Sequence, residues 1–430
     1  MNKAITVGLL GLGTVGSGVI EILRDHKERI EHKTGCDVTI KSVLVSDMSK
    51  PREVPAETQL TDQYQDITRD PEIDVIVEVM GGIDHTLTIL LEAIEHGKHI
   101  VTANKDLVAQ HGEQLFEACQ KHNCDLYYEA SVAGGIPIIR SIMDGLSSDR
   151  ITKMMGIVNG TTNYIMTKMA QDGVDFDSVL KEAQDLGFAE ADPTADVDGL
   201  DAARKMTILS ILGFSMPYSL EDVDIKGIRG ISSDDITYAE ELGYRIKLIG
   251  IAENDHNGVS VSVEPTLLPI QHPLSSVNDE FNAVYVYGDA VGETMFYGPG
   301  AGKLPTATAV VADLIAVLKN IRLGTTGTAY VQPQFPKQVK TKKEQLTKKY
   351  IRLHVDDKAG MLNDLTNIFA QYDLSLDQFT QRSTDQEGER ELMMVTHQVS
   401  EEDFEKAIQD IESLDSVRNI DSIFRVEGGN

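Results

Sequence analysis

The residues best suited to chemistry lie in a segment that is rich in carboxylates and ends on a lysine. Residues 187–205 read Gly-Phe-Ala-Glu-Ala-Asp-Pro-Thr-Ala-Asp-Val-Asp-Gly-Leu-Asp-Ala-Ala-Arg-Lys. Asp201 and Lys205 are four residues apart within a predicted helix over 199–213, so their side chains share one helix face. A lysine can exchange a proton with a substrate oxygen if its pKa is brought near neutrality. This pair is therefore the first candidate for acid–base catalysis.

The remaining residues of this predicted helix distinguish a surface ion pair from a functional one. At about 100° per residue, Ile208 and Leu212 fall in the same sector as Asp201 and Lys205. The opposite side is predicted to face solvent and carries Arg204, Thr207 and Ser210. A surface pair is worth only roughly 0.3–0.5 kcal/mol. A charged pair on an apolar face is costly unless it has a task, which favours an active site.

A glycine-rich turn near the N-terminus predicts a dinucleotide site. It follows a predicted strand over 5–10, precedes a predicted helix over 15–32, and consists of Gly11, Leu12, Gly13, Thr14, Val15 and Gly16. In Gly-x-Gly-x-x-Gly the glycines permit a tight turn, close approach of a pyrophosphate, and packing of helix on strand. The helix N-terminus adds free amides and a partial positive charge. The alternative is a purely structural turn, which its place after the first strand disfavours.

The end of the second predicted strand, 38–45, bears on the choice between NADP and NAD. An acidic residue there would bind the ribose hydroxyls and repel a 2′-phosphate, and Asp47 lies close to that position. Lys50 and Arg52 follow just beyond and could meet a 2′-phosphate. We expect NADP, with NAD as the alternative.

Strand and helix patterns divide the chain into three predicted domains. Residues 1–130 alternate as a parallel, Rossmann-like α/β sheet, and residues 131–331 read as an α+β substrate-binding and dimerisation domain. The last helix of this second domain, 305–320, is expected to return to the first domain. Residues 332–349 carry two prolines and six lysines and are expected to be a solvated linker. Residues 350–427 read strand–helix–strand–strand–helix–strand, a ferredoxin-like order.

Composition narrows the possible partners. The 430 residues include 39 Lys and Arg against 68 Asp and Glu, a formal net charge of −29, which argues against nucleic acid as a partner. The three cysteines form no obvious ligand set and are expected to be reduced thiols of a cytoplasmic protein. No apolar run is expected to reach the roughly 20 residues that span a bilayer. The scattered histidines predict no zinc site.

Six segments in order resemble the signature segments of homoserine dehydrogenases, over essentially residues 1–330. They are residues 11–16, Thr-Ala-Asn-Lys at 102–105, Tyr-Glu-Ala-Ser-Val-Ala-Gly-Gly-Ile-Pro at 128–137, Gly-Ile-Val-Asn-Gly-Thr-Thr-Asn-Tyr-Ile at 156–165, residues 187–205, and Tyr-Gly-Pro-Gly-Ala-Gly-Lys-Leu-Pro-Thr at 297–306. The resemblance implies reversible, NAD(P)-dependent interconversion of L-homoserine and L-aspartate 4-semialdehyde. It also implies a place in threonine, methionine and isoleucine biosynthesis and a homodimer or homotetramer.

The resemblance further implies roles for individual residues. Lys205 would be the acid–base group, and Lys105 would polarise the reacting oxygen near the nicotinamide. Glu190 would bind the substrate amine, while Asp196 and Asp201 would order the amine and a water. Further contacts are implied at Gly160 and Thr161 for the substrate and at Thr102 and Gly302 for the cofactor. A monovalent cation, usually sodium in the family, would be bound by Glu129 and the backbone carbonyls of Val132, Gly134 and Ile136.

Residues 350–427 resemble the ACT domain. In that domain a glycine turn, here Gly360, lets backbone amides meet the carboxylate of an amino-acid effector at a helix start. The family usually has proline before this glycine, whereas Ala359 stands here. The module is expected to sense an amino acid, with a mere dimerisation module as the alternative. Because the preceding linker is expected to be solvated, the module should also be separable from the rest.

Two other functions compete with this interpretation. A semialdehyde dehydrogenase that forms an acyl-phosphate would need a nucleophilic cysteine, and no cysteine occupies a plausible position. A regulatory protein that had lost catalysis would not need Lys105, Glu190, Asp201 and Lys205 together. Both alternatives are disfavoured.

Overall fold

The computed structural model describes residues 3–328 and 333–428. Its chain forms two compact units, and each consists of three stretches of sequence. The first unit comprises Met1–Ile151, Arg204–Glu221 and Asn282–Lys337. The second unit comprises Thr152–Ala203, Asp222–Phe281 and Gln338–Asn430.

The first unit contains a six-stranded parallel sheet with the strand order β3-β2-β1-β4-β5-β6. This is the order of dinucleotide-binding folds, and it places a crevice where β1 and β4 lie side by side with their connections leading to opposite edges. The strands are β1 (Lys3–Leu10), β2 (Cys36–Leu44), β3 (Gln59–Thr61), β4 (Val75–Glu78), β5 (His99–Thr102) and β6 (Leu126–Tyr127). The expected Rossmann-like fold is thereby confirmed.

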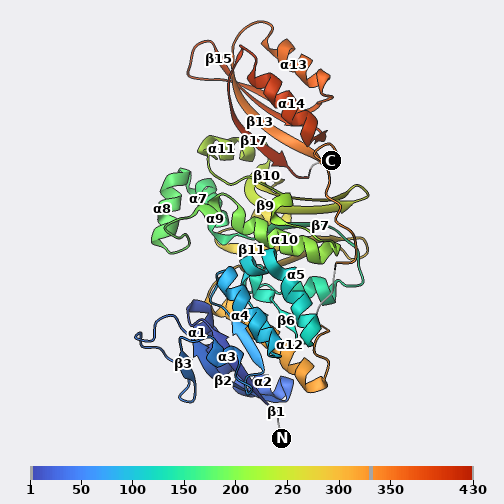
Figure 1. Cartoon of the computed structure of the whole chain (residues 1–430). Coiled ribbons are helices and arrows are strands. Elements are labelled where there is room, and N and C mark those ends of the chain that lie inside the picture. Colours follow the sequence, from blue (N-terminus) through green and yellow to red (C-terminus); the bar gives the residue numbers. More distant parts are fainter. Residues whose placement is uncertain (1–2, 329–332, 429–430) are drawn as a thin grey trace. The chain divides into compact units, whose positions relative to one another are not determined.

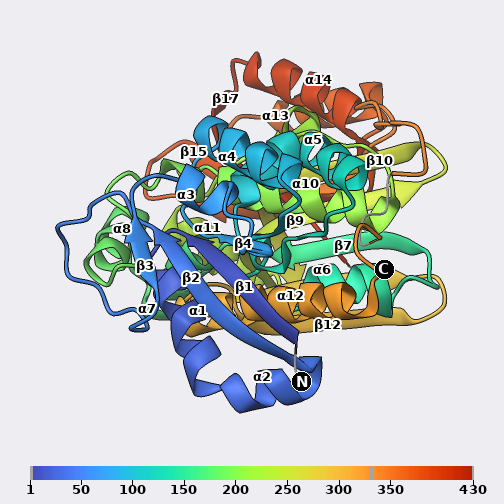
Figure 2. The same ribbon diagram turned by 60° about the horizontal axis from the view of Figure 1, so that its bottom comes forward.

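Helices cover both faces of this sheet, as Figure 2 shows. The helices of the unit are α1 (Thr14–Asp25), α2 (Lys27–Thr34), α3 (Gln65–Thr68), α4 (Asp84–Glu95), α5 (Lys105–His122), α6 (Ile138–Arg140) and α12 (Lys303–Leu323), with short turns η1 (Glu129–Ser131) and η2 (Ser141–Gly145). The sequence predicted one helix over 15–32, but the chain breaks at His26, between α1 and α2. The outer strands β11 (Phe281–Gly288) and β12 (Gly292–Pro299) are consecutive and neighbouring.

Helix α12 is long and apolar enough to cross a membrane by length and composition. The sequence expectation that no run has this character was therefore wrong. In the structure Val310, Leu314 and Val317 are fully buried in the core that α12 forms with α1 and the sheet strands β1, β2 and β4. Core packing thus accounts for the composition of this helix.

The second unit is built on strands in the order β7-β9-β10-β17-β13-β15-β14. Strands β7 (Ile151–Ile157), β8 (Val223–Ile225), β9 (Tyr244–Asp255) and β10 (Gly258–Pro269) accompany α7 (Gly160–Asp172), α8 (Phe176–Asp185), α9 (Thr194–Val197), α11 (Ser233–Glu241) and the turn η4 (Pro273–Ser276). Helix α10 (Leu200–Phe214) and the turn η3 (Leu220–Asp222) run across the boundaries between units. No strand was predicted from the sequence over β9, so the long β9–β10 hairpin was not foreseen.

The C-terminal part of this unit has the expected strand–helix–strand–strand–helix–strand order (Figure 1). Its elements are β13 (Leu346–Asp356), α13 (Met361–Gln371), β14 (Leu376–Ser383), β15 (Glu389–Thr396), β16 (Val399–Ser400), α14 (Glu401–Glu412) and β17 (Val417–Val426). Alternate residues of β13, such as Ile351 and Leu353, face α13 and α14 in one apolar core. The intervening residues Arg352 and His354 lie on the opposite face.

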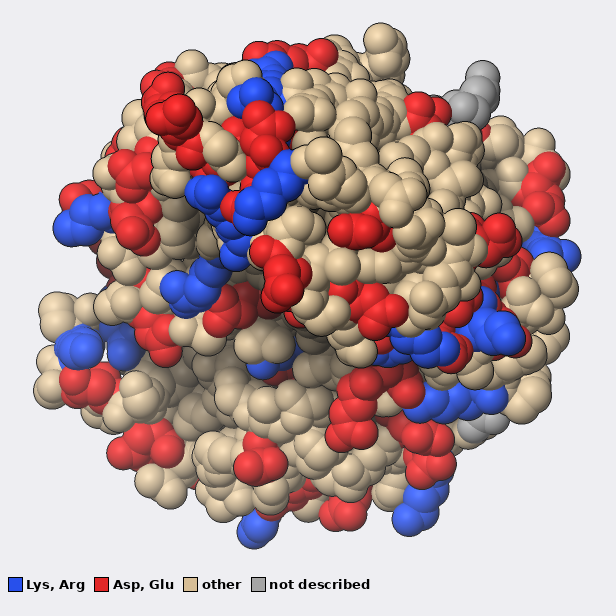
Figure 3. Space-filling view, turned by 90° about the horizontal axis from the view of Figure 1, so that it is seen from above, with Lys and Arg blue, Asp and Glu red and all other residues tan. Residues whose placement is uncertain are grey.

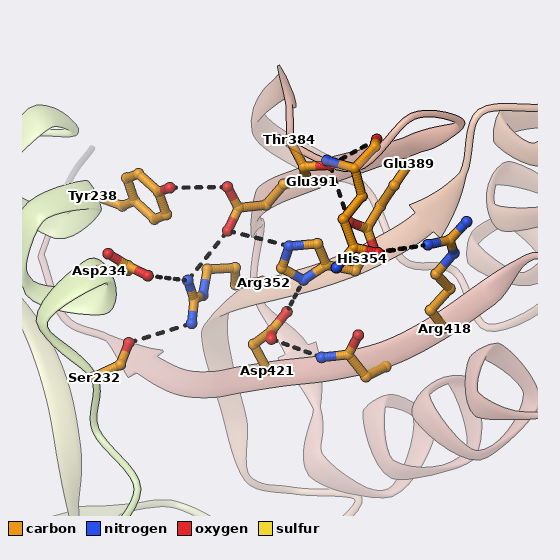
Figure 4. Close-up of polar contacts among 12 residues, drawn as sticks. Ser232, Asp234, Tyr238, Arg352, His354, Thr384, Glu389, Glu391, Arg418 and Asp421 are labelled. Carbon is orange, nitrogen blue, oxygen red and sulfur yellow. Dashed lines mark hydrogen bonds and ion pairs between the residues drawn. The ribbon is translucent and has the colours of Figure 1, made fainter.

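That opposite face carries a polar cluster that joins the C-terminal sheet to α11. The Arg352 guanidinium lies 2.9 Å from Asp235 and 3.1 Å from Glu391, and the Tyr238 hydroxyl donates to Glu391 at 2.9 Å. Figure 4 shows Arg352 and Glu391 between residues of α11 and the imidazole of His354, which pairs with Asp421. The C-terminal module is therefore packed on the rest of its unit through charged side chains.

The segment before β13 is not the solvated linker that its lysines predicted. Lys340 is 6% exposed and pairs with Asp255 at 2.8 Å, and Lys349 is 6% exposed and pairs with Glu401 at 2.6 Å. Strands β10 and β17 are also paired, with Thr266 opposite Arg425. The prediction failed because a lysine-rich run resembles a tether unless its carboxylate partners, here distant in sequence, are known.

Acidic and basic side chains are intermixed on the face of the molecule shown in Figure 3, and the basic ones form no continuous surface there.

Candidate active site

The glycine turn has the geometry that a pyrophosphate requires. Gly11 has a φ of +101°, and a Cβ placed there would lie 2.9 Å from the Cα of Met80. A Cβ on Gly16 would lie 2.3 Å from the Gly11 carbonyl oxygen, whereas Gly13 has open space around it. Gly13 caps α1 without a side-chain hydrogen bond, so the first amides of the helix remain available to an anion.

A buried carboxylate fixes the two turns on the other side of this crevice. Glu78 is fully buried at the end of β4 and accepts the amides of Met80 and Gly81 at 2.8 and 3.0 Å. Its other oxygen accepts the Thr102 hydroxyl at 2.6 Å, and burial raises the pKa of this carboxyl. The Thr102 side chain is therefore bonded within the protein, and its oxygen also accepts the amide of Asn104 at 3.0 Å.

The positive charge expected next to the adenosine end comes chiefly from Arg52. Its guanidinium donates to the Leu12 carbonyl in the glycine turn at 3.1 Å. In the part of the chain that the structure describes, its Nε is buried and has no hydrogen-bond partner. Lys50 is largely exposed and lies 3.8 Å from Asp47, so its ammonium is less firmly positioned than the Arg52 guanidinium.

The two lysines of the sequence analysis lie in the first unit on two different helices. Lys105 is the first residue of α5, whose start is capped by the Asn104 side chain at 3.1 Å from the Leu107 amide. Lys205 lies on α10 and, like Lys105, is half-buried. Their sequence neighbours Arg204 and Asp106 form an ion pair of 3.0 Å, so the start of α5 and this stretch of α10 are close together.

Helix α10 is buried more completely than its wheel predicted. Asp201 is 4% exposed, as expected for the apolar face. Thr207 and Ser210, which were expected to face solvent, are 0% and 1% exposed. The Ser210 hydroxyl is satisfied by the Thr207 carbonyl at 2.9 Å. Small polar residues that bond their own helix can be buried, and the wheel could not distinguish them from a solvent face.

Glu129, the expected cation ligand, lies in a network of buried charges. Its carboxylate oxygens accept the amides of Ile139 and Arg140, each at 2.8 Å, and its own amide donates to Asp313 at 2.7 Å. Asp313 also pairs with Arg140 at 2.6 Å. Burial, and then the charge of Glu129, raise the pKa of Asp313 to about 7.

The loop after Glu129 carries the three carbonyls expected at the cation. Ala133 and Gly134 both have positive φ, 54° and 55°, and a Cβ on Gly134 would meet the Gly300 carbonyl at 2.3 Å. The Ile136 carbonyl accepts the Ile138 amide at 2.8 Å. The negative charge fits a cation here, but the Glu129 carboxylate is already bonded to two amides. Any ion would therefore depend mainly on main-chain oxygens, including those of Val132 and Gly134.

Gly302, expected to approach the cofactor, is the residue before α12 and has a φ of +124°. A side chain there would be strained by the backbone conformation whatever the space around it. The residue starts a helix whose first turn contains no acidic residue. This end of α12 is thus compatible with a nearby anion.

In the second unit, two expected substrate ligands meet at one asparagine. The Asn159 amide nitrogen donates to Asp196 at 2.7 Å and to Asp201 at 2.8 Å. The Asn159 side-chain oxygen accepts the Thr162 amide at 2.8 Å and so caps α7. Asn159 is 4% exposed. The sequence placed this residue inside a recognised segment but gave it no role.

The other expected substrate residues lie at the start of α7 and in the loop before α9. Gly160 is the first residue of α7, and a Cβ there would lie 2.7 Å from the Glu280 carbonyl. The Thr161 hydroxyl donates to the Phe188 carbonyl at 2.7 Å, which ties the helix to the loop that carries Glu190. Glu190 itself is exposed. The structure thus brings Asp196, Asp201, Gly160 and Thr161 to one region and leaves the Glu190 side chain on the surface of its unit.

Several buried groups of the structure were not singled out from the sequence pattern. Glu78 could have been found as a carboxylate inside an apolar strand, but nothing marked Asp313 in a helix far along the chain. Lys247 is also buried, and its ammonium donates to the Val277 carbonyl at 2.7 Å and to Asn163 at 3.0 Å. Burial lowers its pKa to about 7. Among the described residues no cluster of His, Cys, Asp or Glu could hold a metal ion, and all three cysteines are free and buried.

Comparison with known proteins relates most of the chain to one family of enzymes. Residues 11–129 match the model of the homoserine dehydrogenase NAD-binding domain, residues 137–315 that of homoserine dehydrogenase, and residues 349–416 that of the ACT domain. The homoserine dehydrogenase of Bacillus subtilis (strain 168) is 55% identical over 429 residues, 99% of both chains. The chain belongs to the homoserine dehydrogenase family.

Solved members of the homoserine dehydrogenase family share this fold. The enzyme from Thiobacillus denitrificans is 41% identical, with a TM-score of 0.93 over 99% of this chain and 98% of that chain. The Staphylococcus aureus enzyme at pH 7.5 is 38% identical, with a TM-score of 0.79 over all of both chains. The protein is thus an NAD(P)-dependent oxidoreductase that acts on a CH–OH group and carries a C-terminal ACT domain.

Proposed function

We propose that this enzyme interconverts L-homoserine and L-aspartate 4-semialdehyde, with Lys205 as the acid–base group. The carrying observation is the arrangement around Arg204 and Asp106, which sets the half-buried Lys205 on α10 and Lys105 at the start of α5 in one unit. In the oxidative direction the C4–H bond breaks as a hydride leaves and the hydroxyl proton passes to neutral Lys205. The bound nicotinamide supplies the hydride acceptor.

Lys105 would donate to the same oxygen and so stabilise the charge that develops there. The proton transfer requires a neutral amine on Lys205 at the moment when it accepts the proton. The experiment is steady-state kinetics of purified protein with homoserine or aspartate semialdehyde, followed by the absorbance of the reduced nicotinamide. Activity with neither substrate would refute the proposal.

The preferred cofactor is proposed to be NADP. The Arg52 guanidinium, which is bonded to the glycine turn and whose buried Nε has no hydrogen-bond partner among the described residues, supports this choice. A 2′-phosphate would satisfy the hydrogen-bond donors of this guanidinium better than a ribose hydroxyl would. NAD remains the alternative because Asp47 follows the same strand. Competition between the two cofactors for binding, measured by fluorescence of the reduced form, separates them.

A monovalent cation, sodium by family resemblance, is proposed at the loop of Glu129, Val132, Gly134 and Ile136. The support is a buried carboxylate next to main-chain oxygens on a tightly turned loop. The ion would order the loop, and no step of the reaction passes through it. Thermal unfolding in sodium, potassium and a large organic cation tests this without relying on activity. Equal midpoints at equal ionic strength would argue against a site.

The ACT domain is proposed to bind an amino-acid effector at the turn before α13. Gly360 has a φ of +99° and precedes the helix start, where backbone amides could donate hydrogen bonds to a carboxylate. Threonine, methionine and lysine are the effectors to test, in assays of full-length protein. If none changes either the rate or the melting temperature, the domain is a packing or dimerisation module. Cytoplasmic location and a homodimer or homotetramer are further proposals, the latter testable by light scattering.

A further inference from the structure

One buried side chain connects the two carboxylates that are proposed to order the substrate amine. Asn159 lies just before α7 and is 4% exposed. Its Nδ2 is 2.7 Å from Asp196 Oδ1 and 2.8 Å from Asp201 Oδ2. Its Oδ1 is 2.8 Å from the Thr162 amide and 2.9 Å from the Thr162 hydroxyl. All of the residues in this arrangement belong to the second unit.

The orientation of the Asn159 amide follows from its partners. The Thr162 backbone N–H can only donate, so the atom that faces it must be the amide oxygen. The nitrogen therefore points to the two carboxylates, and each of its two hydrogens serves one of them. Each carboxylate therefore accepts one hydrogen bond from the same amide group.

Two carboxylate oxygens that share one donor must lie close together. The two hydrogen-bond lengths, 2.7 and 2.8 Å, add to at most 5.5 Å between Asp196 Oδ1 and Asp201 Oδ2. Like charges at this separation repel, and the repulsion falls when a cation lies between or beside them. An ammonium group would lower this repulsion and could donate to both carboxylates, because it has three donors to share.

We propose that Asn159 is a positioning and specificity-determining residue, whose amide holds Asp196 and Asp201 as a pair that recognises the α-ammonium of the substrate. The proposal rests on the substrate role given above to these two carboxylates. Asn159 also caps α7, and the capping role differs from the proposed role in whether serine can replace asparagine. Serine is as good a helix cap as asparagine. It has a single hydrogen to donate and cannot bridge both carboxylates.

The test therefore compares N159S with the unaltered enzyme. The KM for L-homoserine should rise about 10–100-fold, the loss expected when charge-assisted hydrogen bonds are removed. The dissociation constant of 4-hydroxybutanoate, the same chain without the ammonium, should stay within a factor of about two, as should that of the cofactor. A KM for homoserine that also stays within that factor would overturn the proposal, because the helix cap alone would then explain Asn159.

Two further comparisons keep the test decisive. Asp175 caps α8 at 3.0 Å from the Ser178 amide, so D175S makes the same kind of cap exchange away from the carboxylates and should leave the KM unchanged. D196N and D201N examine the proposed function itself. If these two retain the homoserine KM, the substrate role of the carboxylates is wrong. If they lose affinity while N159S does not, only the role of Asn159 is wrong. Circular dichroism of each variant establishes that α7 is still formed.

Discussion

Arg204 and Asp106 form an ion pair with 3.0 Å between Nε and Oδ1, and each is the sequence neighbour of one of the two lysines proposed to act on the substrate oxygen. Arg204 precedes Lys205 on α10, and Asp106 follows Lys105 at the start of α5. Both side chains are partly buried, which limits their motion. The pair therefore holds close together the two helix segments that carry the lysines proposed to act on one oxygen.

Replacing Lys205 with methionine should leave the fold intact and remove nearly all turnover. Methionine keeps the length of the side chain but has no proton to exchange, and such groups contribute about 10²–10⁴-fold to rate. Steady-state kinetics and a melting curve measure the two effects. K343M, which changes an exposed lysine, is the matched control. A folded K205M enzyme with more than about a tenth of normal turnover would show that another group carries the proton.

Removing the positive charges beyond β2 should change the cofactor preference. R52A is expected to weaken NADP binding more than NAD binding, and K50A should have a smaller effect because Lys50 is exposed and already near Asp47. Loss of one phosphate contact by arginine corresponds to roughly 10–150-fold in affinity. Dissociation constants for both cofactors provide the measurement, with K33A as an exposed-lysine control. Equal losses for NADP and NAD would contradict the NADP proposal.

Glu190→Ala should weaken homoserine binding and leave cofactor binding unchanged. The exposed position of Glu190 within its unit leaves its carboxylate available to a ligand ammonium. A rise of about 10-fold or more in the KM for homoserine is expected from loss of a charged partner. A higher cofactor dissociation constant with an unchanged KM for homoserine would contradict this prediction for Glu190.

Asp313 should make stability depend on pH in the mildly acidic range. Its pKa is about 7 in the folded protein and near its ordinary value when unfolded, so the folded state binds more protons between these values. By linkage, this group's contribution to stability is fully present below about pH 4 and is lost as the pH rises towards 7. In D313N that decline should disappear, whereas D415N, at an exposed site, should retain it. Urea unfolding midpoints from pH 5 to 7.5 give the comparison, and parallel curves for D313N and the parent would rule the effect out.

Deleting the ACT domain should destabilise the second unit, contrary to the separable module that the lysine-rich segment predicted. A chain that ends at Lys340 loses the pairing of β17 with β10 and leaves Glu253 and Glu264 without Arg425, which is 3.5 and 3.9 Å away in the intact chain. The exposed edge of β10 should also promote aggregation. Melting temperature and light scattering test this. A monomeric or dimeric truncated enzyme with an unchanged melting temperature would show that the module is independent.

The sequence was most informative where local pattern and chemistry coincide. The glycine turn, the parallel strands and the order of the ACT elements all follow from residues near one another in the chain. The helix wheel was wrong for Thr207 and Ser210 because both are buried, and the Ser210 hydroxyl bonds the Thr207 carbonyl within the helix. The predicted linker was wrong at Lys349 because its partner Glu401 lies 52 residues away in the sequence. Asn159 was inside a recognised segment, yet only coordinates reveal that its amide reaches Asp196 and Asp201.

Helix α12 completes the apolar core of a sheet whose last strand, β6, ends at Tyr127. The ribosome makes about 5–20 residues per second, so roughly 10–35 seconds separate the synthesis of β6 from that of the start of α12 at Lys303. During that interval Val310, Leu314 and Val317 are not yet available to cover the strands. Until then only the N-terminal helices such as α1 can cover that face of the nascent sheet, so part of its apolar surface is open to a chaperone while the second unit is being made.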